Sequence, residues 1–286
     1  MSAPQRIARY YDRNTARFLR LGGSGAALAI HRPLWGSGVT DAAAAAGYIN
    51  TLLAAEAERW LGDPPGHVLD MGCGVGGTVL SLAARWPDAR LAGVTLSAAQ
   101  VARARAEAAR RGLAARCRFD QGDFLSDPAP GAAPADLVVA VESHVHAPGS
   151  TAFLRAAAAR LAPGGVLLVA DDMLDRPEAD LDPAGRALLS ALRRGWHLGH
   201  LSTSAELAAA AGCHGLGLLE DADLTPLIRL DRLRDRLLRI AGPLADRLGL
   251  ARVPFWANAI GGNALTEAYR AGLMRYRLLA FMRVAQ

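Results

Sequence analysis

The sequence predicts an α/β fold in which a mostly parallel, doubly wound sheet carries helices on both faces. Short apolar runs alternate with helix-forming stretches through the middle of the chain. One of these runs, residues 67–71, enters a glycine-rich turn that a helix follows. The 286 residues, 51% of them hydrophobic, are enough to bury such a core together with one appendage.

The glycine-rich turn follows the first predicted strand and reads Asp70-Met-Gly72-Cys-Gly74-Val-Gly-Gly. Because glycine lacks a Cβ atom, the backbone can turn sharply here and a ligand can lie against it. The helix expected over residues 78–86 directs its free amides and the positive end of its dipole at the same place. Such a turn predicts a ligand site, although alone it also fits nicotinamide and flavin cofactors.

Four further strands are expected, and polar residues follow most of them. Residues 91–94 lead into a helix whose start, Ser97 with Gln100 three positions later, has the pattern of a capping box. Residues 115–119 lead to Asp123, residues 135–141 to Glu142, and residues 166–171 end in an acidic pair. Since parallel strands place their carboxyl ends at one sheet edge, these side chains are expected to converge there.

The ordered segments LDMGCGVGG, GVTLSAAQ, QGDF, the acid after the fourth strand and LAPGG resemble a class I S-adenosylmethionine-dependent methyltransferase. The resemblance covers residues 66–172 closely. It implies a Rossmann-like, seven-stranded methyltransferase sheet with helices on both faces. The chain is most similar to a small-molecule group that includes prenyl-diphosphate C-methyltransferases, tocopherol- and sarcosine-type methyltransferases and cyclopropane fatty-acid synthases.

The resemblance implies S-adenosylmethionine as the cofactor and assigns it several residues. Gly72 and Gly74 would let the methionine part approach the backbone, and Asp70 would lie near its ammonium group. Asp123 would accept a hydrogen bond from the adenine amino group, with Phe124 over the ring face.

The remaining cofactor contacts are expected from the second strand and the N-terminal segment. The Thr95 hydroxyl and the Leu96 backbone would meet the ribose and the adenine edge, with Gln100 beside them, and Tyr11 would close over the cofactor. Many relatives carry an acid at the end of the second strand, where a nicotinamide binder also needs one. The segment Gly93-Val-Thr95 has none, which weakens the dinucleotide alternative.

Catalysis is expected at the carboxyl end of the fourth strand, where Glu142, His144 and His146 would share one side of the chain. Methyl transfer from a sulfonium needs alignment and proton removal. For a hydroxyl acceptor, the resemblance to aminosugar O-methyltransferases makes His146 the base, assisted by Asp171 or Asp172. For an alkene acceptor, the resemblance to prenyl-diphosphate enzymes makes Glu142 the base. Alternatively, Glu142 is structural or contacts the cofactor, and one histidine only packs.

Two short clusters are candidates for substrate binding. They consist of His31, Arg32 and Trp35 in the N-terminal segment, and of Arg194, Trp196 and His197 further along the chain. Arginines with aromatic neighbours could clamp an anionic head beside an apolar chain. A Mg²⁺ ion is expected only if that head is a diphosphate. In the alternative interpretation the arginines cap helix ends and the tryptophans fill an interface.

The chain is interpreted as one domain with a cap. Residues 1–62 form an N-terminal helical cap segment, residues 63–223 the cofactor-binding core, residues 224–274 a helical lid insertion, and residues 275–286 the last core strand. The resemblance implies that this strand lies antiparallel between two neighbours. The three cysteines match neither a disulfide framework nor a zinc-binding pattern, so no metal site is predicted.

The net charge of +5 does not indicate a nucleic-acid partner, because the arginines are dispersed and alternate with acids. There is no apolar run near 20 residues and no signal-peptide pattern, so a cytoplasmic protein without membrane insertion is expected. The expected partner is a small-molecule substrate, and a homo-oligomer stays open.

Three functions follow from these observations. The first is methyl transfer to a small, apolar specialised metabolite, in its narrower form C-methylation of an isoprenoid or a prenyl diphosphate. The second is O- or N-methylation of a hydroxylated or amine natural product. The third, from another class, is a cofactor-binding or scaffold protein without catalysis.

Overall fold

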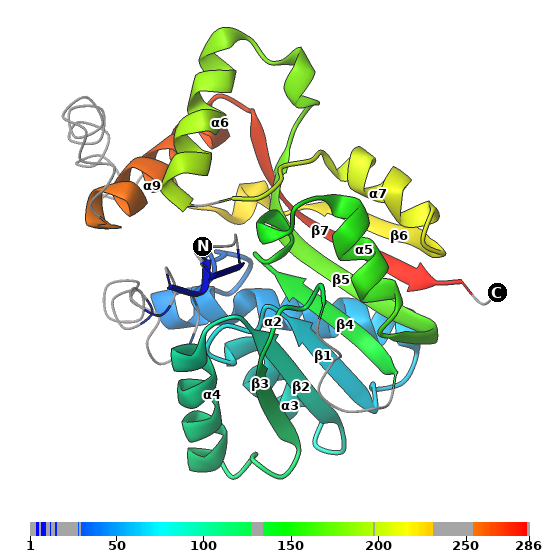
Figure 1. Cartoon of the computed structure of the whole chain (residues 1–286). Coiled ribbons are helices and arrows are strands. Elements are labelled where there is room, and N and C mark those ends of the chain that lie inside the picture. Colours follow the sequence, from blue (N-terminus) through cyan, green and yellow to red (C-terminus); the bar gives the residue numbers. More distant parts are fainter. Residues whose placement is uncertain are drawn as a thin grey trace.

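The computed structural model describes residues 4–5, 7–9, 12, 15, 28, 30–126, 134–196, 198–230 and 254–284. Its described residues include a seven-stranded sheet of order β3-β2-β1-β4-β5-β7-β6 (Figure 1). The strands are β1 His67–Met71, β2 Arg90–Thr95, β3 Cys117–Gln121, β4 Ala135–Val141, β5 Leu161–Leu174, β6 Leu216–Asp223 and β7 Met274–Arg283. Strand β7 runs antiparallel between β5 and β6, which confirms the predicted place of the last strand.

Helices cover both faces of this sheet, and each face has its own hydrophobic core. The larger helices are α2 Ala42–Leu61, α3 Gly77–Arg85, α4 Ala98–Arg110, α5 Ser150–Ala158, α6 Pro183–Trp196, α7 Ser204–Gly212 and α9 Pro254–Arg270. Side chains of α2, α3 and α4 pack on one face, and those of α5 and α7 on the other. Successive strand residues point to opposite faces, so Val138 and Val139 enter different cores. The predicted fold class is confirmed.

The third strand is displaced from the predicted position by two residues. It was expected over residues 115–119 and spans Cys117–Gln121 instead. The amides of Arg116 and Cys117 both donate to the Leu113 carbonyl, which keeps the preceding residues in a turn. The later start carries the strand on to Gln121, which pairs with Thr95. Residue propensities for strand formation could not locate the start of β3, because the preceding turn depends on a backbone hydrogen-bond pattern.

The strand order reverses direction between β1 and β4, and this reversal places the site. From β1 the chain builds outward through β2 and β3, and then returns to add β4 on the other side of β1. The loops after β1 and β4 therefore leave the sheet in opposite directions and open a crevice between them. The glycine turn and Glu142 lie at the two sides of this crevice.

Helices α6 and α9 pack against each other beyond the carboxyl ends of the strands (Figure 1). A Cβ atom on Gly261 would lie 2.6 Å from Cδ1 of Trp196, so glycine permits the close approach of the two helices. Helix α9 and the short helix Thr225–Leu227 fall within the predicted lid, of which residues 231–253 lie outside the described part. No helix among the described residues is long and apolar enough to cross a bilayer.

Candidate functional site

The glycine turn after β1 is tightly packed against the loop after β4. Gly72 has φ +100°, and a Cβ atom there would lie 2.5 Å from Cβ of Ser143. The Ser143 hydroxyl donates to the Met71 carbonyl at 2.5 Å, which joins the two loops. Gly74, at φ +53°, has Ile30 within 3.9 Å of its Cβ position. Only glycine gives this turn its conformation without strain.

Replacing Gly72 by alanine should therefore lower the free energy of unfolding by about 2–3 kcal/mol, because the new methyl group meets both a positive φ and Ser143. Urea denaturation would measure this change. Gly47→Ala is the matched control, since Gly47 lies inside α2 with open space around its Cβ position. The control should stabilise the protein by up to about 1 kcal/mol. Equal midpoints for the two variants would contradict the packing argument.

Asp70, one residue before the end of β1, is a buried carboxylate, with 3% of its surface exposed. Within the described part of the chain, no group donates a hydrogen bond to it. Burial raises the pKa of Asp70 to about 7, because desolvation disfavours the charged form. A buried acid without a protein donor is suited to bind a cationic ligand group.

The end of β2 is polar but carries no carboxylate. The Thr95 hydroxyl donates to Oε1 of Gln100 at 2.7 Å, and the Ser97 hydroxyl caps α4. Ser97 also donates to Asp12 at 2.5 Å, which ties the N-terminal segment to this end of the sheet. A Cβ atom on Gly93 would lie 2.6 Å from Cβ of Cys73, so no side chain fits at that position.

The segment after β3 is held in a turn, in which the Leu125 amide donates to the Asp123 carboxylate at 2.9 Å. The Phe124 ring packs edge-on against Phe153, with ring centroids 6.1 Å apart. The Leu96 carbonyl accepts from the Gln121 side chain at 3.1 Å. Phe124 is thus mainly a core residue, and its predicted contact with an adenine face stays a prediction.

These residues fit S-adenosylmethionine at the end of β1. The turn has no room for a side chain at Gly72, and beside it lies the Asp70 carboxylate, which has no hydrogen-bond donor among the described residues. Asp70, Gly72 and Gly74 would hold the methionine part, whose ammonium group supplies the missing donor. Tyr11, which was predicted to close over the cofactor, lies outside the described residues.

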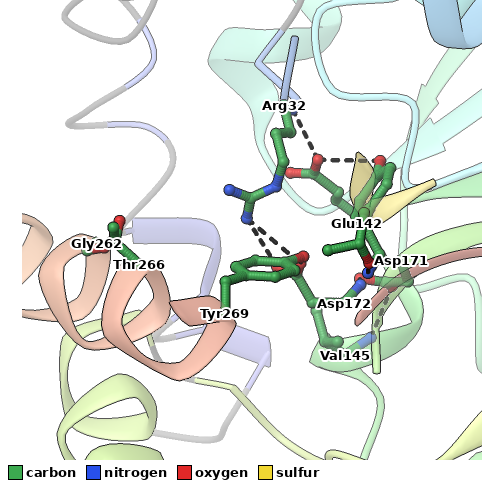
Figure 2. Close-up of polar contacts among 10 residues, drawn as sticks. Arg32, Glu142, Val145, Asp171, Asp172, Gly262, Thr266 and Tyr269 are labelled. Carbon is green, nitrogen blue, oxygen red and sulfur yellow. Dashed lines mark hydrogen bonds and ion pairs between the residues drawn. The ribbon is translucent and has the colours of Figure 1, made fainter. Parts of the chain in front are cut away.

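A second cluster joins two acids, one arginine and two tyrosines at the ends of β4 and β5 (Figure 2). The Arg32 amide donates to Oε1 of Glu142 at 2.7 Å, and the Tyr276 hydroxyl donates to the same oxygen at 3.1 Å. The Arg32 guanidinium contacts both oxygens of Asp172, at 3.1 and 3.3 Å. The Tyr269 hydroxyl also donates to Asp172. We call these five residues the acid–tyrosine cluster.

The cluster surrounds a positive charge with aromatic rings and carboxylates. The guanidinium carbon of Arg32 lies 5.1 Å from the ring centroid of Tyr269 and 5.8 Å from that of Tyr276. Both distances are in the range of cation–π attraction. The cluster can therefore stabilise a cation and contains carboxylates that can accept a proton.

Glu142 has two unusual properties. Its pKa is raised to about 7, because burial and the charge of Asp172 raise it by more than Arg32 lowers it. Its backbone has φ +49°, a left-handed conformation that is uncommon for glutamate. The Glu142 amide donates to the Ala170 carbonyl at 2.8 Å, which helps to hold it there. Strain retained beside a buried acid is typical of functional sites.

Asp171 and Asp172 are adjacent but have different roles. Side chains alternate along β5, so only Asp172 reaches Arg32. Asp171 accepts from the amides of Val145 at 3.2 Å and of Asp172 at 2.8 Å. Burial raises the pKa of Asp171 well above its usual value, and the charges of Asp172 and Glu142 add to this. The structure therefore gives Asp171 backbone partners and gives Asp172 contacts with Arg32 and Tyr269, and the predicted assistance of His146 by either acid stays a prediction.

The histidines after β4 belong to a short 3₁₀ helix, His144–His146, rather than to an extended segment. Nε2 of His144 lies 3.2 Å from the Ser150 hydroxyl, and its ring packs against Phe153. Burial lowers the pKa of His144 to about 3. The expected shared side does not hold for His144, because the 3₁₀ turn directs it to α5. His146 is partly buried at the end of the turn.

The predicted substrate residues separate into distinct environments. Arg32 is in the acid–tyrosine cluster, and burial lowers the pKa of the adjacent His31 to about 4. The Arg229 guanidinium lies 3.6 Å from the ring centroid of Trp35. On α6, Arg194 is exposed and donates to Ser190, whereas Trp196 packs against α9. His197 lies outside the described residues.

Tyr269 and Tyr276 were not predicted from the sequence, and Asp172 was considered only as an alternative to Asp171. In the sequence, Tyr276 has the pattern of an ordinary core residue in an alternating strand, and Tyr269 has that of a residue on the apolar side of a helix. One signal was available for Tyr276. The alternation at the start of its strand predicts a buried tyrosine, and a buried tyrosine hydroxyl needs a hydrogen-bond partner. Tyr276 is 0% exposed.

Comparison with known proteins agrees with this geometry. Residues 68–165 match a family described as a methyltransferase domain. A 24-methylenesterol C-methyltransferase 2 from Oryza sativa subsp. japonica is 30% identical over 203 residues, which cover 71% of this chain and 52% of that protein. An ajmaline N-methyltransferase from Rauvolfia serpentina is 34% identical over 124 residues, or 43% of this chain and 40% of that protein. The chain thus spans about half of the length of the rice relative and less than half of the length of the Rauvolfia relative.

Two solved structures extend the likeness over nearly the whole chain. The [4+2]-cyclase SpnF has a TM-score of 0.73 and 26% identity, with 99% of this chain and 96% of that chain covered. A geranyl diphosphate C-methyltransferase from Streptomyces coelicolor A3(2) has a TM-score of 0.72 and 20% identity, with 99% of each chain covered. The fold and the glycine turn agree with these comparisons: residues 68–165 belong to the methyltransferase-domain family that their sequence matches, and the chain as a whole shares the fold of the two solved structures.

Proposed function

We propose that this protein methylates a carbon atom of a small, apolar isoprenoid, with S-adenosylmethionine as methyl donor and Glu142 as the base. The observation that carries the proposal is the acid–tyrosine cluster at the crevice. It combines a partly buried carboxylate with two tyrosine rings at cation–π distance from a positive charge. These groups suit a reaction in which an alkene becomes a cation and then loses a proton.

S-adenosylmethionine, when bound, supplies an electrophilic methyl group on a sulfonium and leaves as S-adenosylhomocysteine. The acceptor's double bond provides the electron pair of the new carbon–carbon bond, so its second carbon is left positive. The rings of Tyr269 and Tyr276 stabilise this charge. Glu142 then takes a proton from the adjacent carbon, and the C–H electron pair restores a double bond. Glu142 ends protonated, which its raised pKa favours.

The proposed reaction is favoured over O- or N-methylation by the positions of the two candidate bases. Glu142 is fixed by two donors, Arg32 and Tyr276, within the cluster. Burial lowers the pKa of His144 far below neutrality, and this residue is directed at α5. His146 stays the candidate base if the acceptor is a hydroxyl or an amine. The names of the relatives, which include both a C- and an N-methyltransferase, support methyl transfer as the reaction class. Which atom of the acceptor receives the methyl group is a question for experiment.

An isoprenoid without a charged head suits the cluster better than a prenyl diphosphate does. The Arg32 guanidinium is already paired with Asp172, and Glu142 and Asp171 add further acidic groups. A diphosphate beside these carboxylates would need a metal ion to offset the repulsion. The described residues contain no group of three metal-binding side chains. Magnesium dependence thus becomes one of the measured variables.

The rate should depend on pH through Glu142. A base must be ionised to accept a proton, and the pKa of Glu142 is raised to about 7. We therefore expect kcat to increase about tenfold per pH unit below 7 and to level off above it. Stopped assays between pH 5.5 and 9 would measure the profile. A constant rate over this range would contradict the assignment of Glu142 as the base.

The proposal is tested by incubating the protein with methyl-deuterated S-adenosylmethionine and a panel of acceptors. The panel contains neutral isoprenoid alkenes, geranyl diphosphate with and without Mg²⁺, phenols and amines. Mass spectrometry of products locates the label, and calorimetry measures cofactor binding separately. A carbon-bound label on an isoprenoid is the expected result. Label on oxygen or nitrogen alone would overturn the proposal and favour His146, and a protein that binds no cofactor would exclude methyl transfer altogether.

A further inference from the structure

Arg32 makes two kinds of contact with the acids of the crevice, and the two kinds are independent. Its backbone amide donates to Glu142 at 2.7 Å, a contact that any residue except proline could make. Its guanidinium contacts both oxygens of Asp172 through Nη2, at 3.1 and 3.3 Å, and this contact requires a positively charged side chain. Arg32 comes from the N-terminal segment, whereas the acids end β4 and β5.

We propose that Arg32 is a positioning residue for the reaction, whose guanidinium pairs with Asp172 so that Glu142 is the carboxyl that accepts the proton. This proposal rests on the proposed function, because it assigns Glu142 the role of base. It goes beyond that function by explaining how one of several neighbouring acids is selected.

One of the carboxyl groups is selected as the base because the cluster has more carboxyl groups than positively charged side chains. The groups that face Glu142 are Arg32 from the N-terminal segment, Asp171 and Asp172 from β5, Tyr276 from β7 and Tyr269 from α9. One guanidinium cannot pair with all three carboxyl groups, of which Asp171 and Asp172 are buried and Glu142 is partly buried. The contacts decide where the charge stays.

Asp172 has the stronger set of donors. It accepts two contacts from the guanidinium and one from the Tyr269 hydroxyl. Charge-assisted bonds of this kind favour the ionised carboxylate. Glu142 accepts only from an uncharged amide and a tyrosine hydroxyl. Its proton is thus held more tightly, and burial and the charge of Asp172 both raise the pKa of Glu142.

The proposal predicts shifts of opposite sign for two variants. Arg32→Gln keeps the amide contact but removes the positive charge, so the midpoint of the kcat–pH profile should move up by about one pH unit. Asp172→Asn removes the negative charge next to Glu142, so the midpoint should move down by about one unit. In the double variant the two effects oppose each other, and the midpoint should return toward that of the unchanged protein.

A second readout does not need turnover. Carbon-13 NMR of protein labelled at the glutamate side-chain carboxyl carbons would follow the ionisation of Glu142, whose signal is identified by its loss in Glu142→Gln. The same opposite shifts are expected there. If the protein transfers no methyl group but these shifts occur, the proposed function fails and the role of Arg32 in setting the charge stands.

The matched control is Arg85→Gln, which removes another arginine from a two-point contact, with Glu58 at 2.8 and 2.9 Å on the outer surface. It should leave both midpoints unchanged. Arg32→Lys restores the charge and should recover most of the original midpoint. Thermal melts of all variants verify folding. The proposal would be overturned if Arg32→Gln and the unchanged protein had equal pH midpoints, or if Arg32→Gln and Asp172→Asn shifted the midpoint in the same direction. Arg32 would then only hold the N-terminal segment in place.

Discussion

Replacing Glu142 by glutamine should lower kcat by about 10³-fold, because a general base contributes about 10²–10⁴-fold to a rate. Glutamine is nearly isosteric and can still accept from the Arg32 amide and the Tyr276 hydroxyl, so the fold and both contacts should persist. Only the proton acceptor is lost. Single-turnover assays with labelled cofactor would measure the chemical step, and calorimetry would show an unchanged Kd for the cofactor.

His146→Ala is the paired variant for this experiment. If Glu142 is the base, the histidine variant should retain most of its activity, because His146 lies at the end of the 3₁₀ turn and not in the acid–tyrosine cluster. The reverse pattern, with activity retained in Glu142→Gln and lost in His146→Ala, would transfer the chemistry to the histidine. It would also favour a hydroxyl or amine acceptor over an alkene.

Replacing Asp70 by asparagine should weaken cofactor binding by about 10²–10³-fold and at the same time stabilise the protein without ligand. The cofactor's ammonium group would lose its ionic partner, and breaking a buried ion pair costs about 3–5 kcal/mol. Without ligand, however, the buried carboxylate has no donor among the described residues. Asparagine removes that desolvation cost. Calorimetry measures the affinity, and thermal melts measure the stability.

The stability effect should depend on pH in a defined direction. The pKa of Asp70 is raised from 3.8 to about 7 in the fold, so between these values only the folded state holds the proton. Stability should therefore decrease as pH rises from 4 to 7, by up to about 4 kcal/mol from this group, and then level off. Asp70→Asn should lack this decrease. Parallel melting curves for both proteins across pH 4–8 would contradict a buried, unpaired carboxylate.

Much of the fold could be predicted because its signals are local. The strand over residues 135–141 follows from a short apolar run that this segment displays by itself, whereas the antiparallel placement of the last strand was implied by the resemblance to the family. The glycine turn could likewise be recognised in the sequence, because the positive φ of Gly72 and the close contact with Ser143 require glycine at this position. The start of β3 was misplaced because it depends on the turn at Leu113.

The glycine turn and the buried Asp70 beside it were therefore predicted from the sequence itself, in β1 and the turn that follows it. The acid–tyrosine cluster was decided only by the tertiary structure. Its contacts join Arg32 to Glu142 across 110 residues and Tyr269 to Asp172 across 97 residues. Local patterns do not specify such pairs, because long-range contacts form only when the sheet order brings distant strand ends together. The different contacts of Asp171 and Asp172 have the same origin, because the alternation of β5 sends them to opposite faces and only the tertiary structure decides what lies on each face.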